Sequence, residues 1–251
     1  MARRLRLDAD MVRRGLVASR AEASRAIEAN SVLVNGAVAD KSSRLVDPAD
    51  AVVVQQRSRF VSRGGDKLDA ALDSFAIDVA GMRALDAGAS TGGFTDCLLQ
   101  RGAAHVVALD VGHGQLHPKI RADPRVTVFE RFHVVDVTPD AIGGDVDLVV
   151  ADLSFISLVR VLSPLIAVCR PTGQLVLLVK PQFEAGRAEV DRGSGVIRDP
   201  AIHQRVCDEV SAALVERGCE VVGWIDSPIT GAQGNREFLV HARVRRSGSA
   251  P

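Results

Sequence analysis

The chain has 251 residues, 47% of them apolar and 25% charged, and its formal net charge is zero. These values are typical of a globular protein with room for one large α/β domain and a smaller one. Asp152 and Arg160 interrupt the apolar stretch at 146–168, so we expect no membrane span, and the first residues show no secretory signal. Four cysteines without a C-x-x-C pair predict no metal site and reduced thiols in the cytoplasm.

Basic residues are concentrated at the amino end. Residues 1–60 contain 11 Arg or Lys and 7 Asp or Glu, so the remainder carries an equal acidic excess. This asymmetry indicates that the amino end meets a polyanion.

The first 55 residues predict two helices and a small sheet. One helix is expected over 8–15, and a capping box of Ser19 and Glu22 opens a second that runs to about residue 29. Asn35-Gly36 is a hairpin turn signal. The expected strands are 32–34, 37–38 and 51–54.

This segment resembles the alpha-L RNA-binding domain of ribosomal proteins. The likeness lies in Arg6-Leu7-Asp8, in residues 16–20 and in Val32-x-Val34-Asn35-Gly36. It implies a small α+β domain over 3–55 that contacts structured RNA, mostly through phosphates, which give affinity with little sequence information. A solvated charged helix is the alternative. The residues expected to bind RNA are Arg4, Arg6, Arg13, Arg14, Arg20, Arg25 and Lys41.

A linker is expected at 56–62 and a second domain over 63–245. Its first helix is amphipathic, with Leu68 and Leu72 on one side, and carries Lys67. An apolar strand at 82–85 then enters a glycine-rich loop. Glycine lets a backbone approach a ligand, and N–H groups at a helix start attract anions and polar groups.

Three kinds of ligand fit such a loop, and residue spacing separates them. Phe94 replaces the lysine that a phosphate-binding P-loop requires, and the glycines at 88, 92 and 93 do not match G-x-G-x-x-G. The remaining pattern, D-x-G-x-x-x-G-G from Asp86 onward, suits S-adenosylmethionine, which has no pyrophosphate. An ordinary strand-to-helix turn is the alternative.

Polar residues stand where four predicted parallel strands end. Asp110 lies 24 positions after Asp86, and Rossmann-type sheets place a ribose-binding carboxylate about 20 residues on. We therefore expect Asp110 to bind ribose, an exposed strand-end residue being the alternative. Asp152 and Lys180 end two further apolar runs, and ligands bind at such ends.

The remaining expectations are strands at 126–129, 220–225 and 237–244, a mobile loop at 183–200, a helix at 201–216 and a disordered tail at 246–251.

Methyl transfer to a ribose 2′-hydroxyl needs an activated oxygen placed opposite the sulfonium. A lysine of lowered pKa can provide this activation, and carboxylates can position lysines. Lys67 in R-G-G-D-K-L, Asp152 in A-D-L-S-F, Lys180 in V-K-P-Q-F-E and Glu237 in N-R-E-F resemble the K-D-K-E tetrad of ribose 2′-O-methyltransferases related to FtsJ.

With the basic module in front, residues 3–245 resemble the TlyA family, whose members methylate cytidine ribose in ribosomal RNA. The resemblance implies a Rossmann-like α/β methyltransferase sheet behind the small α+β domain. It also implies S-adenosylmethionine as cofactor, ribosomal RNA or ribosomal subunits as partners, and a monomer. By this resemblance, Lys180 would activate the ribose hydroxyl, and Lys67, Asp152 and Glu237 would position that hydroxyl. The implied cofactor-binding residues are Asp86, Gly88, Ser90, Thr91, Gly92, Gly93, Phe94, Asp110 and Asp152.

Other points stay open at this stage. His133 and Asp136 leave the adenine contacts undecided. A non-catalytic RNA-binding assembly factor is a rival function. A membrane-active hemolysin is another, because one relative carries that label, although the absence of an apolar span argues against it.

Overall fold

The computed structural model describes residues 4–28, 30–54, 59–231 and 233–245, without the side chains of 187, 188 and 192. The described residues form two compact units, which divide between residues 58 and 59. The expected disordered tail at 246–251, the expected helix end at residue 29 and residues 56–58 of the expected linker lie outside the described residues.

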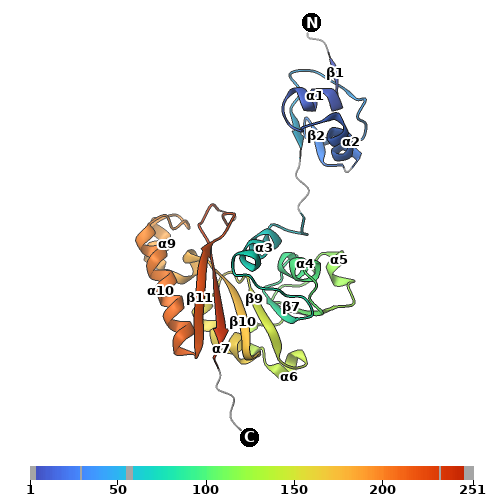
Figure 1. Ribbon diagram of the computed structural model, residues 1–251. Helices are drawn as coiled ribbons and strands as arrows, with labels where there is room; N and C mark the ends of the chain where they lie inside the picture. Colours follow the sequence, from blue (N-terminus) through green and yellow to red (C-terminus); the bar gives the residue numbers. More distant parts are fainter. Residues whose placement is uncertain (1–3, 29, 55–58, 232, 246–251) are drawn as a thin grey trace. The chain divides into compact units, whose positions relative to one another are not determined.

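The amino-terminal unit packs two helices with two small antiparallel sheets (Figure 1). Its core includes Leu7, Met11 and Ile27 from the helices and Val32 from the central strand. A ladder between β1 and β4 was not anticipated from the sequence. The elements are β1 (Leu5–Arg6), α1 (Leu7–Arg13), α2 (Arg20–Glu28), β2 (Val32–Val34), β3 (Ala37–Val38), β4 (Leu45–Val46) and β5 (Val52–Val54).

Local sequence signals explain how these elements begin and end. Ser19 Oγ accepts the N–H of Glu22, whose own carboxylate accepts the N–H of Ala18, so the start of α2 is capped. Asn35 and Gly36, with φ of +52° and +81°, form the turn between β2 and β3.

The second unit is built on one seven-stranded sheet. Its strands are β6 (Arg83–Ala87), β7 (His105–Asp110), β8 (Val126–Glu130), β9 (Val146–Ala151), β10 (Cys169–Val179), β11 (Cys219–Asp226) and β12 (Phe238–Val244). The spatial order is β11-β12-β10-β9-β6-β7-β8, and only β12 runs antiparallel to its neighbours. The strand order reverses between β6 and β9, which is where open α/β sheets bind ligands.

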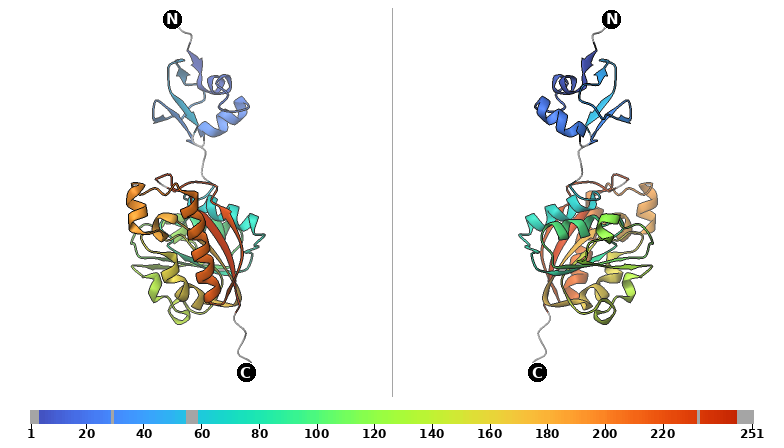
Figure 2. Two further views of the ribbon diagram at one scale, coloured as in Figure 1. Left: turned by 90° about the vertical axis from the view of Figure 1, so that its left-hand side faces the viewer. Right: turned by 90° about the vertical axis from the view of Figure 1, so that its right-hand side faces the viewer.

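Helices cover both faces of this sheet, as the two side views show (Figure 2). Along β9, Val149 packs in the core shared with α7 and α10, while Val150 packs in the core shared with α3 and α4. This alternation explains the unbroken apolar runs, because both faces are buried. The helices are α3 (Gly64–Ser74), α4 (Gly93–Gln100), α5 (Pro118–Arg121), η1 (Val134–Asp136), α6 (Pro139–Ile142), α7 (Leu158–Ala167), α8 (Pro181–Glu184), α9 (Arg187–Arg192) and α10 (Pro200–Glu216).

Residues 59–62 pack within the second unit, although the sequence placed them in the linker. Phe60 is buried against the helices, and Val61 donates its N–H to the buried carboxylate of Asp96 at 2.9 Å. The expected loop at 183–200 includes the end of α8 and all of α9.

Candidate active site

Asp86 lies near the end of β6, just before the glycine-rich loop, and is fully buried. Thr95 Oγ1 donates a hydrogen bond to Asp86 Oδ2 at 2.6 Å, whereas Oδ1 has no hydrogen-bond partner among the described residues. Burial raises the pKa of Asp86 to about 7, against the opposing effect of the Thr95 hydrogen bond. Asp86 therefore ties the strand end to the first turn of α4.

Asp110 joins the glycine-rich loop to the end of β7. Its Oδ2 accepts the N–H of Ser90 at 2.8 Å, and its Oδ1 accepts the N–H of Gly112 at 2.6 Å. Gly88 has a φ of +85°, and a Cβ there would lie 2.6 Å from the carbonyl oxygen of Asp152. Only glycine lets the loop pass this close to the end of β9.

A cleft of about 530 Å³ opens at this edge of the sheet, a volume that suits a nucleoside-sized ligand. Four of the sequence-predicted cofactor residues line it: Gly88, Ser90, Asp110 and Asp152. His133 lines it too. Sequence reasoning missed other lining residues, which follow the ends of β7, β8 and β9: Gln115, Phe132, Leu153, Ser154 and Phe155.

Five predicted cofactor residues do not line the cleft: Asp86, Thr91, Gly92, Gly93 and Phe94. A Cβ on Gly92 would lie 2.9 Å from a Leu116 side-chain carbon, and one on Gly93 would lie 2.2 Å from Ser62 Oγ. Phe94 is buried beside α3. These positions pack the start of α4 against its neighbours, and their contact with a cofactor stays a prediction.

The first of two lysine–carboxylate pairs joins α3 to the residue that precedes β12. Lys67 Nζ lies 2.6 Å from Glu237 Oε2, and the two side chains are 10% and 3% exposed. A charged pair this well buried is stable only because each partner neutralises the other. The pair places an ammonium group next to the residue at which β12 is about to begin.

The second pair joins the ends of β9 and β10. Lys180 Nζ lies 2.6 Å from Asp152 Oδ1. This contact is an ion pair without a hydrogen bond, because Asp152 Oδ1 accepts no hydrogen bond from the described residues. Lys180 Nζ instead donates a hydrogen bond to Ser154 Oγ at 2.9 Å.

Strand register shows that the two lysine–carboxylate pairs lie at the same edge of the sheet. Val179 of β10 is paired with Phe238 of β12, so Lys180 and Glu237 extend from this pair toward the same edge of the sheet. On the other side of β10, Ala151 of β9 is paired with Leu177, and Asp152 follows it. All four residues of the predicted tetrad therefore lie at one edge of the sheet, and one of them, Asp152, lines the cleft.

The identity of the two amines is chemically informative. The chain has 31 basic residues, but only four of them are lysine, at 41, 67, 119 and 180. Two of these four form the pairs described above. Arginine stays protonated in proteins, whereas lysine can lose its proton, so lysine is the basic residue suited to accept one during a reaction.

Two buried carboxylates organise the arginines of the amino-terminal unit. Asp8 accepts a two-pronged hydrogen bond from Arg6 and a further one from Arg20 at 2.8 Å. The Arg6 guanidinium holds the pKa of Asp8 at about 2, well below its usual range. Arg6 and Arg20 stay about half exposed while held in this way. Arg4, Arg25 and Lys41 are exposed as well.

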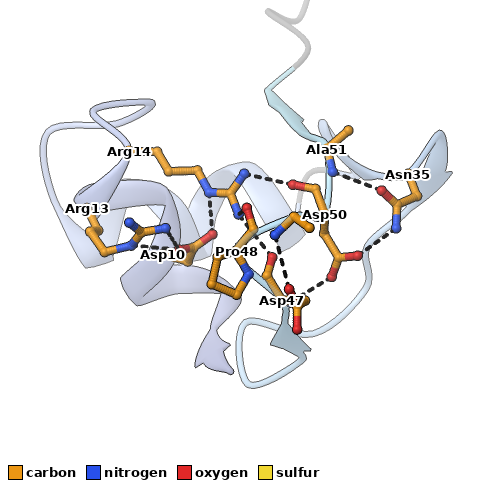
Figure 3. A network of polar contacts seen from close by, with 9 residues as sticks. Asp10, Arg13, Arg14, Asn35, Asp47, Pro48, Asp50 and Ala51 are labelled. Carbon is orange, nitrogen blue, oxygen red and sulfur yellow. Dashed lines mark hydrogen bonds and ion pairs between the residues drawn. The ribbon is translucent and has the colours of Figure 1, made fainter. Parts of the chain in front are cut away.

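Arg13 and Arg14, predicted together as phosphate ligands, have different environments (Figure 3). Both contact the buried carboxylate of Asp10, and the Arg13 side chain is 52% exposed. Arg14 is only 21% exposed and also donates hydrogen bonds to the carbonyl oxygens of residues 47, 48 and 50. Its donors are thus engaged within the domain.

The described ranges contain no group of three or more His, Cys, Asp or Glu side chains arranged to hold a metal ion. In those same ranges, none of the helices has the length and apolar character needed to cross a bilayer.

Comparison with known domains accounts for both units. Residues 60–244 match the FtsJ-like methyltransferase family, and residues 5–52 match the S4 domain. Together with the strand order and the cleft at its reversal point, these matches define an S-adenosylmethionine-dependent RNA methyltransferase.

Comparison with individual relatives identifies the family within this class to which the chain belongs. It is 51% identical to the 16S/23S rRNA (cytidine-2′-O)-methyltransferase TlyA of Mycobacterium tuberculosis, over 98% of this chain and 92% of that protein. It is 39% identical to hemolysin A of Brachyspira hyodysenteriae, over 94% and 99%. A solved structure from Streptococcus thermophilus with a provisional hemolysin name is 40% identical over 98% and 90%, with a TM-score of 0.75. The chain belongs to the TlyA family of FtsJ-like methyltransferases.

Proposed function

We propose that the chain transfers a methyl group from S-adenosylmethionine to the ribose 2′-hydroxyl of cytidine in 16S ribosomal RNA, 23S ribosomal RNA or both. The observation that carries the proposal is the pair of lysine–carboxylate contacts at the edge of a nucleoside-sized cleft. The M. tuberculosis relative is named for this reaction. A ribosomal subunit as substrate, a cytoplasmic location and a monomeric state belong to the same proposal.

The lining of the cleft fits the proposed cofactor. The Asp110 carboxylate, held by two backbone N–H groups, is oriented to accept hydrogen bonds from ribose hydroxyls. Gly88 and Ser90 offer backbone to the methionine end, and Phe132 and Leu153 offer apolar surface to the adenine. S-adenosylmethionine supplies a methyl group activated by its bond to a positively charged sulfur.

The proposed roles of the tetrad follow from its pairing. Lys180 Nζ, the amine nearest the cleft residues Asp152 and Ser154, accepts the proton of the 2′-hydroxyl. Asp152 stabilises the ammonium that results. Lys67 and Glu237, the more buried pair, support this edge and place a second charged pair beside it.

Two features support RNA as the substrate. The S4 domain presents half-exposed arginines held in place by Asp8 and Asp10, and arginine is a common ligand of nucleic-acid phosphates. At the cleft, Phe155 is 92% exposed and its ring centroid lies 5.4 Å from that of Phe183. Aromatic rings exposed in this way are surfaces on which an unpaired base can stack.

The test is mass spectrometric mapping of ribose methylation in ribosomal RNA and isolated subunits, incubated with the full chain and S-adenosylmethionine. We expect methylated cytidines with the wild-type chain and none with Lys180→Ala, because the proton acceptor is then absent. Calorimetry should find cofactor affinity in Lys180→Ala within a few-fold of the wild-type value. RNA binding without methylation by the wild-type chain would instead support the rival function of an assembly factor.

A further inference from the structure

Ser154 is the one neighbour of Lys180 in the described structure that accepts a hydrogen bond from its Nζ, at 2.9 Å. Asp152, the charged neighbour, lies closer but without hydrogen-bond geometry. The charge of Asp152 therefore keeps the Lys180 ammonium at this edge, and the hydrogen bond to Ser154 sets the direction of one of its N–H bonds.

The segment that carries Ser154 is held firmly against the turn that carries Lys180. Glu184, at the end of α8, accepts hydrogen bonds from Ser157 Oγ and from the N–H of Leu158, both at 2.6 Å. Phe155 has a φ of +65°, an unfavourable conformation for an aromatic residue. The hydrogen bonds to Glu184 therefore hold the residues that follow Ser154 against the turn that carries Lys180.

The Nζ atom of Lys180 has three substituent positions at fixed angles to one another, so the contact with Ser154 restricts all three. Rotation about the Cε–Nζ bond carries the three substituent positions of the nitrogen together. When one N–H points at Ser154 Oγ, the other two positions are determined, and the negative charge of Asp152 attracts the second N–H. In the neutral amine the lone pair then occupies the third position.

We propose that Ser154 is a positioning residue that directs the lone pair of Lys180 toward the RNA ribose. The inference rests on the proposed 2′-O-methylation. In that step the 2′ oxygen passes its proton to the lone pair of Nζ as it bonds to the methyl carbon. The bond from that carbon to sulfur breaks, with its electron pair left on sulfur. Lys180 leaves the step as an ammonium and later returns the proton to water.

Valine and threonine at position 154 form a matched pair, because the two side chains have the same shape and only threonine keeps a hydroxyl. We expect kcat of Ser154→Val to fall by about ten-fold or more, since misdirected proton transfer is costly. Ser154→Thr should stay within about three-fold of the wild type. KM for RNA and calorimetric affinity for S-adenosylmethionine should change little in either variant. A merely structural defect would affect both variants alike.

A second measurement needs neither cofactor nor RNA. With only four lysines, a chain labelled with ¹³C at lysine Cε gives four side-chain NMR signals, and Lys180→Ala identifies that of Lys180. Ser154→Val should move this signal and leave those of Lys41, Lys67 and Lys119 in place, while Ser154→Thr should move it less. An unmoved signal, or equal kcat for Ser154→Val and wild type, would refute the inference. A wild-type chain that methylates no ribose would refute the proposed function and leave the NMR result to decide on the contact.

Discussion

Lys67 Nζ and Glu237 Oε2 lie 2.6 Å apart, although 170 positions separate the two residues in the chain. The pair links α3, at the start of the second unit, to the beginning of its last strand. Removing one partner of such a pair leaves an uncompensated buried charge, which costs about 3–5 kcal/mol, whereas replacing both is close to neutral.

We therefore expect Lys67→Met to destabilise the second unit by several kcal/mol and the double variant Lys67→Met with Glu237→Gln to recover most of the loss. Urea unfolding followed by fluorescence measures this cleanly, because Trp224 is the only tryptophan and lies in the second unit. Neither variant should methylate RNA. A double variant as unstable as the single one would show that the two charges do not compensate each other.

Asp110 should govern cofactor affinity. Asp110→Asn preserves the size of the side chain, and its carbonyl oxygen can still accept one of the two backbone N–H groups, but the variant loses the other and the negative charge that ribose hydroxyls would contact. We expect affinity for S-adenosylmethionine to fall by about 10- to 100-fold, as for the loss of hydrogen bonds to a charged group. Calorimetry on the full chain measures this, with Asp123→Asn, which alters a surface turn, as control. Unchanged affinity would return Asp110 to the role of a loop anchor.

Asp86 should make the second unit less stable as the pH rises. Because the folded-state pKa is raised to about 7, the folded chain holds this proton where the unfolded chain has released it. Stability from this group is complete below the unfolded pKa and is lost as the pH rises through 7. Asp86→Asn keeps an acceptor for Thr95 and removes the titration.

The stability of Asp86→Asn relative to wild type should thus increase by about 2–3 kcal/mol between pH 5 and pH 8, at about 1.4 kcal/mol per unit. Urea unfolding followed by Trp224 fluorescence at the two pH values gives this difference. A relative stability independent of pH would mean that Asp86 is ionised throughout.

Arg13 and Arg14 should separate RNA affinity from domain stability. Arg13→Ala removes a half-exposed cation, so we expect weaker RNA binding and a shallower dependence of affinity on salt, with the S4 domain still folded. Arg14→Ala removes hydrogen bonds to three carbonyls and to Asp10, so we expect loss of S4-domain stability first. Filter binding over a salt series and hydrogen exchange of residues 5–52 distinguish the two effects. Equal effects on both measurements would contradict this division of roles.

Much of the architecture could be predicted because it depends on short patterns. The Ser19 cap, the Asn35-Gly36 turn and the apolar runs of the parallel sheet behave as their sequence indicates. Glu22 differs from the expected capping box in accepting the N–H of Ala18 and not that of Ser19. The ladder of β1 with β4 could not be foreseen, because two-residue strands carry no periodicity and depend on their partner.

Less of the candidate site than of the fold could be predicted from the sequence. The tetrad pattern named four residues but not their pairing, which depends on the register of β10 with β12 and on the position of α3. Arg14 carries the same charge as Arg13, and only packing shows that its donors are engaged by carbonyls. A hydroxyl two residues after Asp152 could have drawn attention to Ser154, but a lone serine in a loop is too common to be informative.

The reversed direction of β12 has a consequence for the order in which the enzyme is completed. Since it inserts between β10 and β11 and runs against both, it begins at the edge where the parallel strands finish. A nascent polypeptide that extends only through α8 contains Lys67, Asp152 and Lys180 but not yet Glu237. Closure of the sheet and placement of the fourth residue of the predicted tetrad are therefore a single late event in biosynthesis, and we expect partial translation products to be inert.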